Sequence, residues 1–151
     1  MNRLKGNVTI ITGGGKGIGF GLAQAFAAEG SDLVITGRTE SRLLSAKERL
    51  ENEFGIRVLP IVADGADEAA IKKVVSETIS TFGKINTLVN NAQVSKSGLL
   101  LVEHTREDLD LAVFSGLYAA FFYMRECFPY LKETKGSVIN FASGAGMFGK
   151  L

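Results

Sequence analysis

The stretch VTIITGGGKGIG, Val8 to Gly19, decides how the rest of the chain is interpreted. Its first five residues, Val8 to Thr12, are apolar or β-branched without a break, as in a strand buried on both faces of a parallel sheet. Glycines follow at positions 13, 14, 15, 17 and 19, and a helical pattern of apolar residues then begins. A buried strand, a glycine-rich turn and a helix in this order predict the start of a βαβ unit.

The glycines of this turn allow approaches that side chains would block. Gly13 permits a tight turn, Gly17 lets the backbone approach a pyrophosphate, and Gly19 lets the helix pack closely on the strand. The pyrophosphate would lie on the free N–H groups at the helix N-terminus, where the helix dipole is positive. The alternative is an ordinary glycine-rich turn, but the strand before it and the helix after it favour nucleotide binding. The turn is not a P-loop, because no Gly-Lys-Ser/Thr follows the glycines.

Short strands and longer helices continue to alternate along the chain. Further strands are predicted at 32–36, 57–63, 85–92 and 136–143, and helices at about 18–29, 41–54, 71–82 and 106–131. Pro60 inside the third strand indicates an edge or bulged strand. This order predicts one α/β domain over residues 1–151, a Rossmann-type doubly wound parallel sheet of strand order 3-2-1-4-5 with helices on both faces.

Composition restricts the classes of function. The 151 residues carry 17 Lys and Arg against 16 Asp and Glu, a net charge of +1, so no basic surface for nucleic acid is indicated. No apolar run is long enough to cross a bilayer, and the first residues lack the pattern of a secretory signal. The single Cys127 is expected to be buried and fits a reducing, cytoplasmic location. No His and Cys cluster suggests a metal, and His104 is expected at the surface.

The spacing of the first glycines, Gly-x-x-x-Gly-x-Gly in TGGGKGIG, is followed by three further motifs in order. These are Ala63-Asp64 after the third predicted strand, Asn90-Asn91-Ala92 after the fourth, and Ser143 after the fifth. In this pattern the chain resembles the short-chain dehydrogenase/reductase family in its single-domain form, and within it members of the 3-oxoacyl-[acyl-carrier-protein] reductase kind. The resemblance covers the whole chain and implies an oxidoreductase that moves a hydride between a nicotinamide and a hydroxyl or carbonyl group.

The resemblance also implies a set of cofactor-binding residues. They are Gly13, Gly15, Lys16, Gly17, Ile18 and Gly19 in the first turn, Arg38 after the second strand, Asp64 and Gly65 after the third, and Asn91 and Ala92 after the fourth. By this resemblance Asp64 contacts the adenine ring, although an Asp there could also cap a turn. Asn91 and Ala92 would line the nicotinamide ribose. The family's usual next residue is Gly, whereas this chain has Gln93, which changes the turn.

The end of the second strand indicates which nicotinamide cofactor is bound. An acid there bonds the ribose hydroxyls of NAD, and an Arg nearby accommodates the 2′-phosphate of NADP. Here Gly37 stands in the acid's place, Arg38 follows it, and Lys16 lies in the glycine turn. Both cations could instead be solvated surface charges, and Glu40 is close in sequence. The two cations and the missing acid together favour NADP over NAD.

Ser143 is, by the resemblance, the serine that holds the substrate oxygen, although a serine before a glycine turn is also a frequent structural feature. The family's chemistry further needs a tyrosine acid/base and a lysine that lowers its pKa, in a Tyr-x-x-x-Lys motif about a dozen residues further on. Tyr118, Tyr123 and Tyr130 all precede the fifth strand, and the sequence reaches Leu151 before such a motif. We therefore expect residues beyond Leu151 in the intact protein.

The long helix predicted at 106–131 differs from the family in one position. The family's usual mid-helix Asn, part of a proton relay, falls on Gly116 in this sequence, with Ser115 beside it. The apolar residues of the helix are expected to be mostly core: Leu109, Ala112, Val113, Leu117, Phe121, Met124 and Phe128. The resemblance also implies that this helix packs against another copy of the chain, in a homodimer or homotetramer.

Three functions follow from these observations. The first is an NADP-dependent oxidoreductase of a secondary alcohol or ketone on a small apolar substrate, for which Gly98 to Leu101, Met147 and Phe148 could form a pocket wall. The second is a non-catalytic nucleotide-binding protein, which the missing Asn, Gly, Tyr and Lys would favour. A serine hydrolase is excluded, because the residues around Ser143 do not form Gly-x-Ser-x-Gly. We favour the first function.

Overall fold

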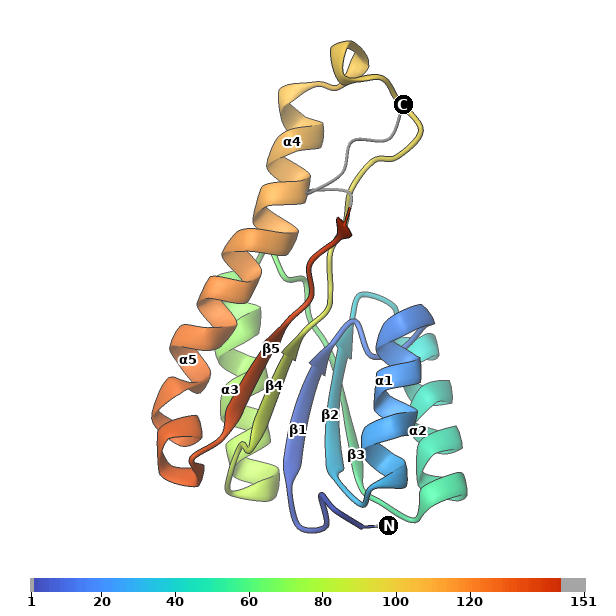
Figure 1. The fold of residues 1–151 in the computed structure, drawn as a ribbon, viewed down its shortest axis with the longest axis vertical. Helices are drawn as coiled ribbons and strands as arrows, with labels where there is room; N and C mark the ends of the chain where they lie inside the picture. The colour runs from blue at the N-terminus through green and yellow to red at the C-terminus, as the bar shows by residue number, and fades with distance from the viewer. Residues whose placement is uncertain (1, 145–151) are drawn as a thin grey trace.

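The computed structural model of the chain describes residues 2–144. Five strands form one parallel sheet: β1 (Val8–Thr12), β2 (Asp32–Gly37), β3 (Val58–Val62), β4 (Thr87–Asn90) and β5 (Ser137–Asn140). Their order in the sheet is β3-β2-β1-β4-β5 (Figure 1), which confirms the predicted doubly wound α/β fold. The direction of winding reverses between β1 and β4, so the carboxyl ends of these two strands form the crevice where such sheets bind ligands.

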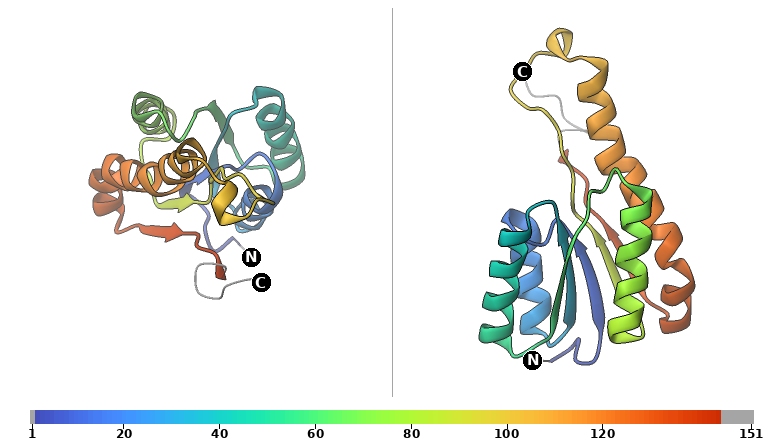
Figure 2. Two further views of the ribbon diagram at one scale, coloured as in Figure 1. Left: turned by 90° about the horizontal axis from the view of Figure 1, so that it is seen from above. Right: turned by 180° about the vertical axis from the view of Figure 1, so that it is seen from behind.

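Helices cover both faces of the sheet (Figure 2). The helices α1 (Gly17–Ala28) and α2 (Glu40–Phe54) pack on one face, and α3 (Glu68–Phe82) and α5 (Ala119–Thr134) on the other. A short 3₁₀ helix, η1 (Leu101–Glu103), precedes α4 (Arg106–Ala112). A π-helical segment, η2 (Val113–Tyr118), joins α4 to α5, so the three form one long helix that extends past the carboxyl ends of the strands (Figure 1).

The alternation of side chains along β1 explains why a strand of this composition lies at the centre of the sheet. Val8 and Ile10 join the apolar cluster under α3 and α5, whereas Ile11 joins the cluster under α1 and α2. All three side chains are buried. Pro60 lies in β3, an edge strand as predicted, where a missing N–H group is tolerated.

Some predicted boundaries were wrong in extent. The strands β3, β4 and β5 are shorter than the predicted ranges. The last residue of β3 is Val62, and the chain leaves the sheet at Asn90 after β4 and at Asn140 after β5. The long helix continues to Thr134, and its middle turn is π-helical instead of α-helical. The predicted ends of the second and third helices, at residues 54 and 82, are correct. Gly55 and Gly83 follow these ends in the left-handed conformation, with φ of 67° and 76°.

The expected core face of the long helix was wrong. The side chains of Leu109, Leu117, Phe121 and Phe128 are between 52% and 70% exposed. The buried positions are instead Ser115, Ala119, Tyr123, Cys127 and Leu131, a stripe with one residue every four. The exposed stripe and the buried stripe are neighbours on the helix, and both are apolar. The buried stripe includes the small residues Ser115, Ala119 and Cys127, which let the helix lie close to the sheet.

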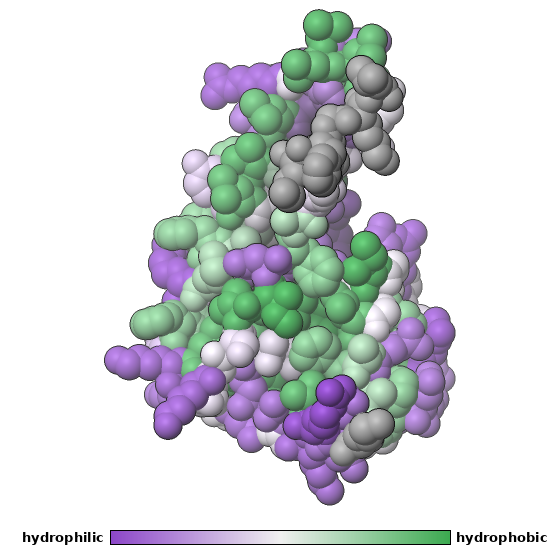
Figure 3. All heavy atoms as spheres, viewed as in Figure 1, coloured by the Kyte–Doolittle hydropathy of each residue, from purple (hydrophilic) through white to green (hydrophobic). Residues whose placement is uncertain are grey.

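A second apolar surface lies on β5. Every residue of this strand is exposed, including Val138 and Ile139, and Phe141 after the strand is exposed too. Figure 3 shows apolar side chains gathered on the face of the molecule where β5 lies. Within residues 2–144, no helix combines the length and the apolar character needed to cross a membrane.

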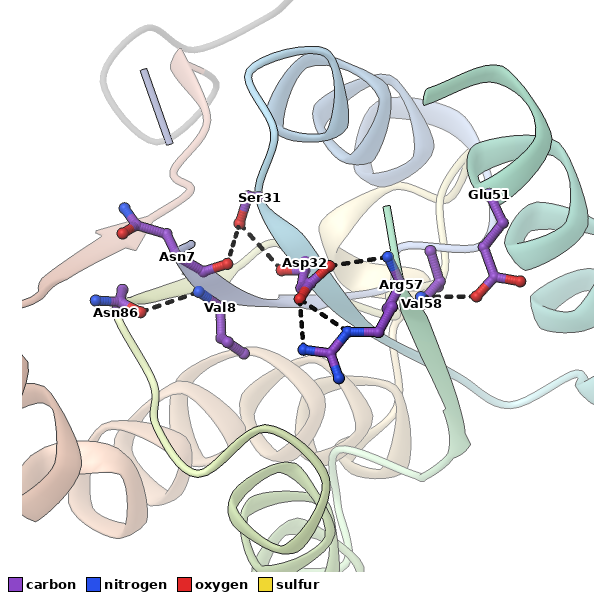
Figure 4. Close-up of polar contacts among 8 residues, drawn as sticks. All are labelled: Asn7, Val8, Ser31, Asp32, Glu51, Arg57, Val58 and Asn86. Atoms are coloured by element: carbon purple, nitrogen blue, oxygen red, sulfur yellow. Dashed lines mark hydrogen bonds and ion pairs between the residues drawn. The ribbon is translucent and has the colours of Figure 1, made fainter. Parts of the chain in front are cut away.

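Polar contacts tie the amino-terminal ends of four strands together (Figure 4). The N–H of Val8 donates to Asn86 Oδ1 at 2.9 Å, just before β4. The Ser31 hydroxyl lies 3.3 Å from Asn7 O and 3.0 Å from Asp32 O. These bonds satisfy backbone groups where the strand ladder begins, and they fix the starting register of the sheet.

Asp32 and Arg57 join the starts of β2 and β3. The Arg57 N–H donates to Asp32 Oδ1 at 2.8 Å, and its guanidinium donates to Asp32 Oδ2 at 2.8 Å and 3.1 Å. The Asp32 carboxylate therefore accepts hydrogen bonds both from the charged side chain and from the backbone N–H of Arg57, next to the edge strand β3.

We predict that Asp32→Ala lowers the free energy of unfolding by about 1–2 kcal/mol, because the variant loses every bond to Arg57. Asp32→Asn should cost roughly half as much, since its amide oxygen can still accept from the Arg57 N–H. Urea unfolding followed by circular dichroism measures both. Equal losses for the two variants would show that the backbone bond contributes nothing.

Candidate functional site

The glycine turn between β1 and α1 brings the helix N-terminus very close to the turn itself. A Cβ atom on Gly19 would lie 2.1 Å from the Gly13 carbonyl oxygen and 2.7 Å from Asn91 Nδ2. Neither atom can move away cheaply, because one is backbone and the other is held by a hydrogen bond. Close packing thus requires glycine at position 19, as predicted. The nearest atoms belong to the glycine turn and to the segment after β4, whereas the prediction named the strand.

Two further glycines pack the turn against its neighbours. A Cβ on Gly14 would lie 2.7 Å from Ile35 Cγ2 in β2, and one on Gly15 would lie 3.1 Å from Leu43 Cδ2 in α2. Gly13 and Gly17 instead need glycine for conformation, with φ of 69° and 53°. Apart from its chain neighbours and the backbone of its own helix, no heavy atom of residues 2–144 lies within 4 Å of the place where a Gly17 Cβ would stand.

The N-terminus of α1 is open toward this space. Lys16 is its N-cap residue, and no side chain caps the first N–H groups of the helix. These donors and the positive end of the helix dipole form a site suited to an anion. Lys16, Gly17 and Ile18 are all exposed. The geometry therefore fits a phosphate group at the turn.

Thr12, at the end of β1, holds the segment after β4. Its Oγ1 accepts from the N–H of Asn91 at 3.0 Å and of Ala92 at 2.9 Å. Asn91 Nδ2 donates back to the Thr12 carbonyl at 3.1 Å. Thr12 is the first residue of the TGGGKGIG motif, but the sequence alone does not indicate what its side chain does. It locks the two strand ends that flank the crevice.

The ends of β4 and β5 are joined by asparagines. Asn90 Nδ2 donates to Asn140 Oδ1 at 2.8 Å, and the N–H of Phe141 donates to the Asn90 carbonyl at 3.0 Å. Asn90 Oδ1 is buried and has no hydrogen-bond partner within residues 2–144. Ser143 follows as an exposed residue beyond β5, on the same side of the sheet as the other strand ends.

The π-helical segment contacts the loop after β4 through Ser115. Its Oγ accepts from the Val94 N–H at 2.9 Å and lies within 2.7 Å of the Leu111 carbonyl and 3.0 Å of the Val94 carbonyl. Gly116 faces Gln93, because a Cβ there would stand 3.5 Å from Gln93 Cγ. The side chain of Ser115 therefore contacts the loop after β4. From the sequence, Ser115 was noted only as the neighbour of Gly116, where the family usually has Asn.

Asp64 and Gly65 lie after β3, against the same helix. Asp64 Oδ1 accepts from the Ala66 N–H at 3.0 Å, so this carboxylate caps its own turn. A Cβ on Gly65 would lie 3.2 Å from Ala119 Cβ and 3.6 Å from the Ser115 carbonyl oxygen. The helix therefore touches the segments that follow both β3 and β4.

The remaining sequence candidates are at the surface. Arg38 is exposed just after β2, and neither it nor Lys16 forms an ion pair among the described residues. Leu100, Leu101 and Val102 are at least 70% exposed. Met147 and Phe148, expected in the same apolar wall, lie outside the described residues.

The buried titratable groups of α5 are unsuited to catalysis. Burial raises the pKa of Tyr123 to about 12 and that of Cys127 to about 12. A phenol that acts as general acid/base needs a pKa nearer the working pH, so Tyr123 is excluded from that role. His104 Nδ1 lies 3.8 Å from Asp108 Oδ2, and no cluster of metal-ligating side chains occurs within residues 2–144.

The site assembles at the carboxyl ends of the strands. The structure brings together Gly13, Gly19, Asn91 and Ala92 directly. Gly65, in the loop after β3, packs against Ala119 of the long helix, and Gly116 of that helix faces Gln93 in the loop after β4. Arg38 and Ile18 are exposed, and within residues 2–144 their side chains form no hydrogen bond or ion pair with these residues. The arrangement is an anion-accepting helix terminus beside a crevice lined by strand ends.

Comparison with known proteins identifies the family. The short chain dehydrogenase family matches residues 7–150. The chain is 55% identical to 12alpha-hydroxysteroid dehydrogenase from Clostridium sp. (strain ATCC 29733 / VPI C48-50), over all of this chain and 61% of that protein. It is 34% identical to 3-oxoacyl-[acyl-carrier-protein] reductase FabG of Thermotoga maritima, over 97% of this chain and 59% of that protein.

Solved structures agree with this family. A short chain dehydrogenase from Burkholderia cenocepacia J2315 in complex with NADP superposes with a TM-score of 0.92 at 30% identity, over 99% of this chain and 60% of that one. NAD⁺-bound xylitol dehydrogenase gives a TM-score of 0.91 at 25% identity, over 98% of this chain and 57% of that one. The chain belongs to the short-chain dehydrogenase family, and it spans about 60% of the length of the relatives it matches.

We predict that Gly19→Ala lowers the free energy of unfolding by about 3 kcal/mol or more, because its methyl group would collide with the Gly13 carbonyl. Gly21→Ala is the matched control in the same helix, since within residues 2–144 no heavy atom outside its own stretch of helix lies within 4 Å of its Cβ position. That variant should be neutral or up to about 1 kcal/mol more stable. Thermal unfolding of both distinguishes crowding from helix propensity, and two equal shifts would contradict the close approach.

Proposed function

We propose that this chain is the dinucleotide-binding part of an NADP-dependent oxidoreductase that interconverts a secondary alcohol and a ketone. The observation that carries the proposal is the uncapped N-terminus of α1 at Lys16, beside the open space at Gly17. A pyrophosphate on these N–H groups would place the rest of a dinucleotide along the crevice between β1 and β4. Membership of the short-chain dehydrogenase family supports the same reading.

The preference for NADP rests on charge at the adenosine end of the crevice. Gly37 ends β2 without a carboxylate, and the exposed cations Arg38 and Lys16 flank that point. An acid would repel a 2′-phosphate, whereas a guanidinium can bind it with two parallel hydrogen bonds. Similar structures include one with NADP and another with NAD⁺. The proposed preference for NADP therefore rests on the local charges of this chain.

The nicotinamide cofactor supplies or accepts the hydride. In the proposed reaction Ser143, after β5, donates a hydrogen bond to the substrate oxygen and holds it near the end of the crevice. Asn91 and Ala92 line the neighbouring ribose position, and Thr12 keeps them in place. In the proposed reaction the proton of the substrate hydroxyl passes to an acid/base, for which the family resemblance implies a Tyr and Lys pair.

The substrate we propose is a steroid-like alcohol or ketone. The protein with 55% identity is named a 12alpha-hydroxysteroid dehydrogenase, and it is more similar than the acyl-carrier reductase at 34%. The exposed Leu100, Leu101 and Val102 offer apolar surface at the loop after β4, which a flat apolar substrate could cover. Gly98, with φ of 85°, marks the turn at which this loop approaches η1.

We also propose that the intact protein is a cytoplasmic homodimer or homotetramer. The exposed stripe of the long helix, with Leu117, Phe121 and Phe128, is large and apolar, and burial between two copies would remove it from water. The alternative function is a non-catalytic nucleotide-binding protein. It would share the glycine turn, and Gln93 and Gly116 are the residues that favour it.

The activity is tested on the intact protein with NADPH and a 12-oxo steroid, or an acetoacetyl thioester, as the carbonyl substrate. We predict NADPH-dependent reduction of the steroid. In a Ser143→Ala variant, kcat should fall by about a hundredfold or more, with an unchanged Kd for NADPH. Binding of NADPH without reduction of either carbonyl would support the non-catalytic alternative. Reduction of the thioester alone would overturn the steroid assignment.

We predict that Arg38→Asp changes the cofactor preference from NADPH toward NADH by about tenfold or more. The variant removes a phosphate-binding cation and adds an acid that can bond the ribose hydroxyls. Fluorescence titration of both reduced cofactors measures the two Kd values. A ratio that does not change would refute the role of Arg38.

A further inference from the structure

The loop between β4 and η1 is held to the long helix at two points. Ser115 Oγ accepts from the Val94 N–H at 2.9 Å. Two residues further along the loop, Lys96 Nζ lies 3.4 Å from Asp108 Oδ1. Positions 108 and 115 are about two helical turns apart. The loop therefore leaves the sheet beside the long helix and reaches η1 near the start of α4 (Figure 1).

Asp108 is held in place independently of Lys96. Its Oδ2 accepts from the Thr105 N–H at 3.0 Å, and its own N–H donates to Thr105 Oγ1 at 3.3 Å, in the capping box that begins α4. The Thr105 N–H and the Lys96 ammonium hold the pKa of Asp108 below its usual value, so the carboxylate is charged at neutral pH. The Asp108 side chain is only 13% exposed. Since one partner is already in place, this ion pair costs less side-chain entropy than a pair of two free side chains.

The Lys96–Asp108 ion pair also connects two different elements. Lys73 and Glu77, 3.6 Å apart, lie one turn from each other on α3, so their ion pair supports that helix and restrains no loop. Lys96 belongs to the loop after β4, whereas Asp108 belongs to α4. Their ion pair therefore restrains the loop against the helix.

The chain that follows Lys96 carries an exposed apolar group. Gly98 turns the chain with φ of 85°, and Leu100 to Val102 are at least 70% exposed. The Leu100 N–H donates to Glu103 Oε2 at 2.6 Å, which closes η1 on itself. Because glycine leaves the backbone free to turn, the position of this apolar group depends on the contact just before Gly98. That contact is the ion pair of Lys96.

We propose that the Lys96–Asp108 ion pair positions Leu100 to Val102 over the substrate, which makes Lys96 and Asp108 positioning residues for the reaction. The inference rests on the proposed function, in which these apolar residues cover a steroid-like substrate. With the ion pair formed, the loop is in place before the substrate arrives. With the ion pair broken, only a fraction of the molecules has the loop in place, and the apparent affinity for the substrate falls by that fraction.

The variant Lys96→Gln tests this role in the intact protein, because it removes the cation and leaves the capping box of Asp108 unchanged. The KM for the 12-oxo steroid should rise about threefold, with an unchanged kcat and an unchanged Kd for NADPH. Added salt should raise the KM of the unsubstituted protein toward that of the variant and leave the KM of the variant constant, because salt screens the ion pair. Lys73→Gln is the matched control: it breaks an ion pair within one helix and should change none of these values.

A second measurement needs neither substrate nor cofactor. Thermolysin cuts before large apolar residues, so it should cut the chain at Leu100 to Val102 about threefold faster in Lys96→Gln than in the unsubstituted protein. The rate in Lys73→Gln should equal that of the unsubstituted protein. This measurement reports whether the ion pair holds the loop, whatever the substrate of the enzyme is.

Several results would overturn the proposal. Equal cleavage rates and an equal KM would show that the ion pair does not hold the loop, and the proposed function would survive. Faster cleavage with an unchanged KM would show that the ion pair holds the loop but plays no part in substrate binding. An equal loss of affinity for NADPH and for the steroid would indicate general destabilisation. If the unsubstituted protein reduces no carbonyl, the proposed function fails, and the substrate role of the ion pair fails with it.

Discussion

The close approach of α1 to the glycine turn is the constraint on which the rest of the site depends. With the Gly13 carbonyl oxygen 2.1 Å from where a Gly19 Cβ would stand, any larger residue would push the helix away from the sheet. Such a shift would move the uncapped N–H groups of α1 out of the crevice. It would also strain Asn91, whose Nδ2 is bonded to Thr12 and lies next to the same point.

The Thr12 hydroxyl connects this approach to the other half of the sheet. Because it accepts two N–H groups of the segment after β4, the ends of β1 and β4 are held together by side-chain bonds beyond the last strand pair. The crevice at the reversal of strand order therefore has one rigid wall. These hydrogen bonds hold the segment after β4 in one position beside the donors at the start of α1.

Most of the fold could be predicted from the sequence because its signals are local. The unbroken apolar run of Val8 to Thr12 and the glycines at 55 and 83 act within a few residues, and the structure confirms them. The buried face of the long helix could not be predicted from the sequence, because two neighbouring stripes of the helix are apolar. Periodicity does not say which of the two contacts the sheet. The π-helical turn at Val113–Tyr118 has no such local signal either.

The residues of the candidate site were likewise only partly predictable from the sequence. The glycines and Asn91 were found through a motif, because their spacing along the chain is fixed. The contacts of Ser115 were missed, because they depend on what the folded chain brings near its side chain. Ser115 meets Val94 from 21 residues away.

The long helix links the crevice to the outer surface of the molecule. On its inner side Ser115 holds the Val94 loop, and Ala119 contacts Gly65. On its outer side, within two turns, Leu117 and Phe121 are exposed. A helix is stiff, so a partner that covers the outer stripe also restrains the inner contacts. Ser115 and Leu117 both belong to the π-helical segment, so this one turn carries the contact with the Val94 loop on its inner side and part of the exposed apolar stripe on its outer side.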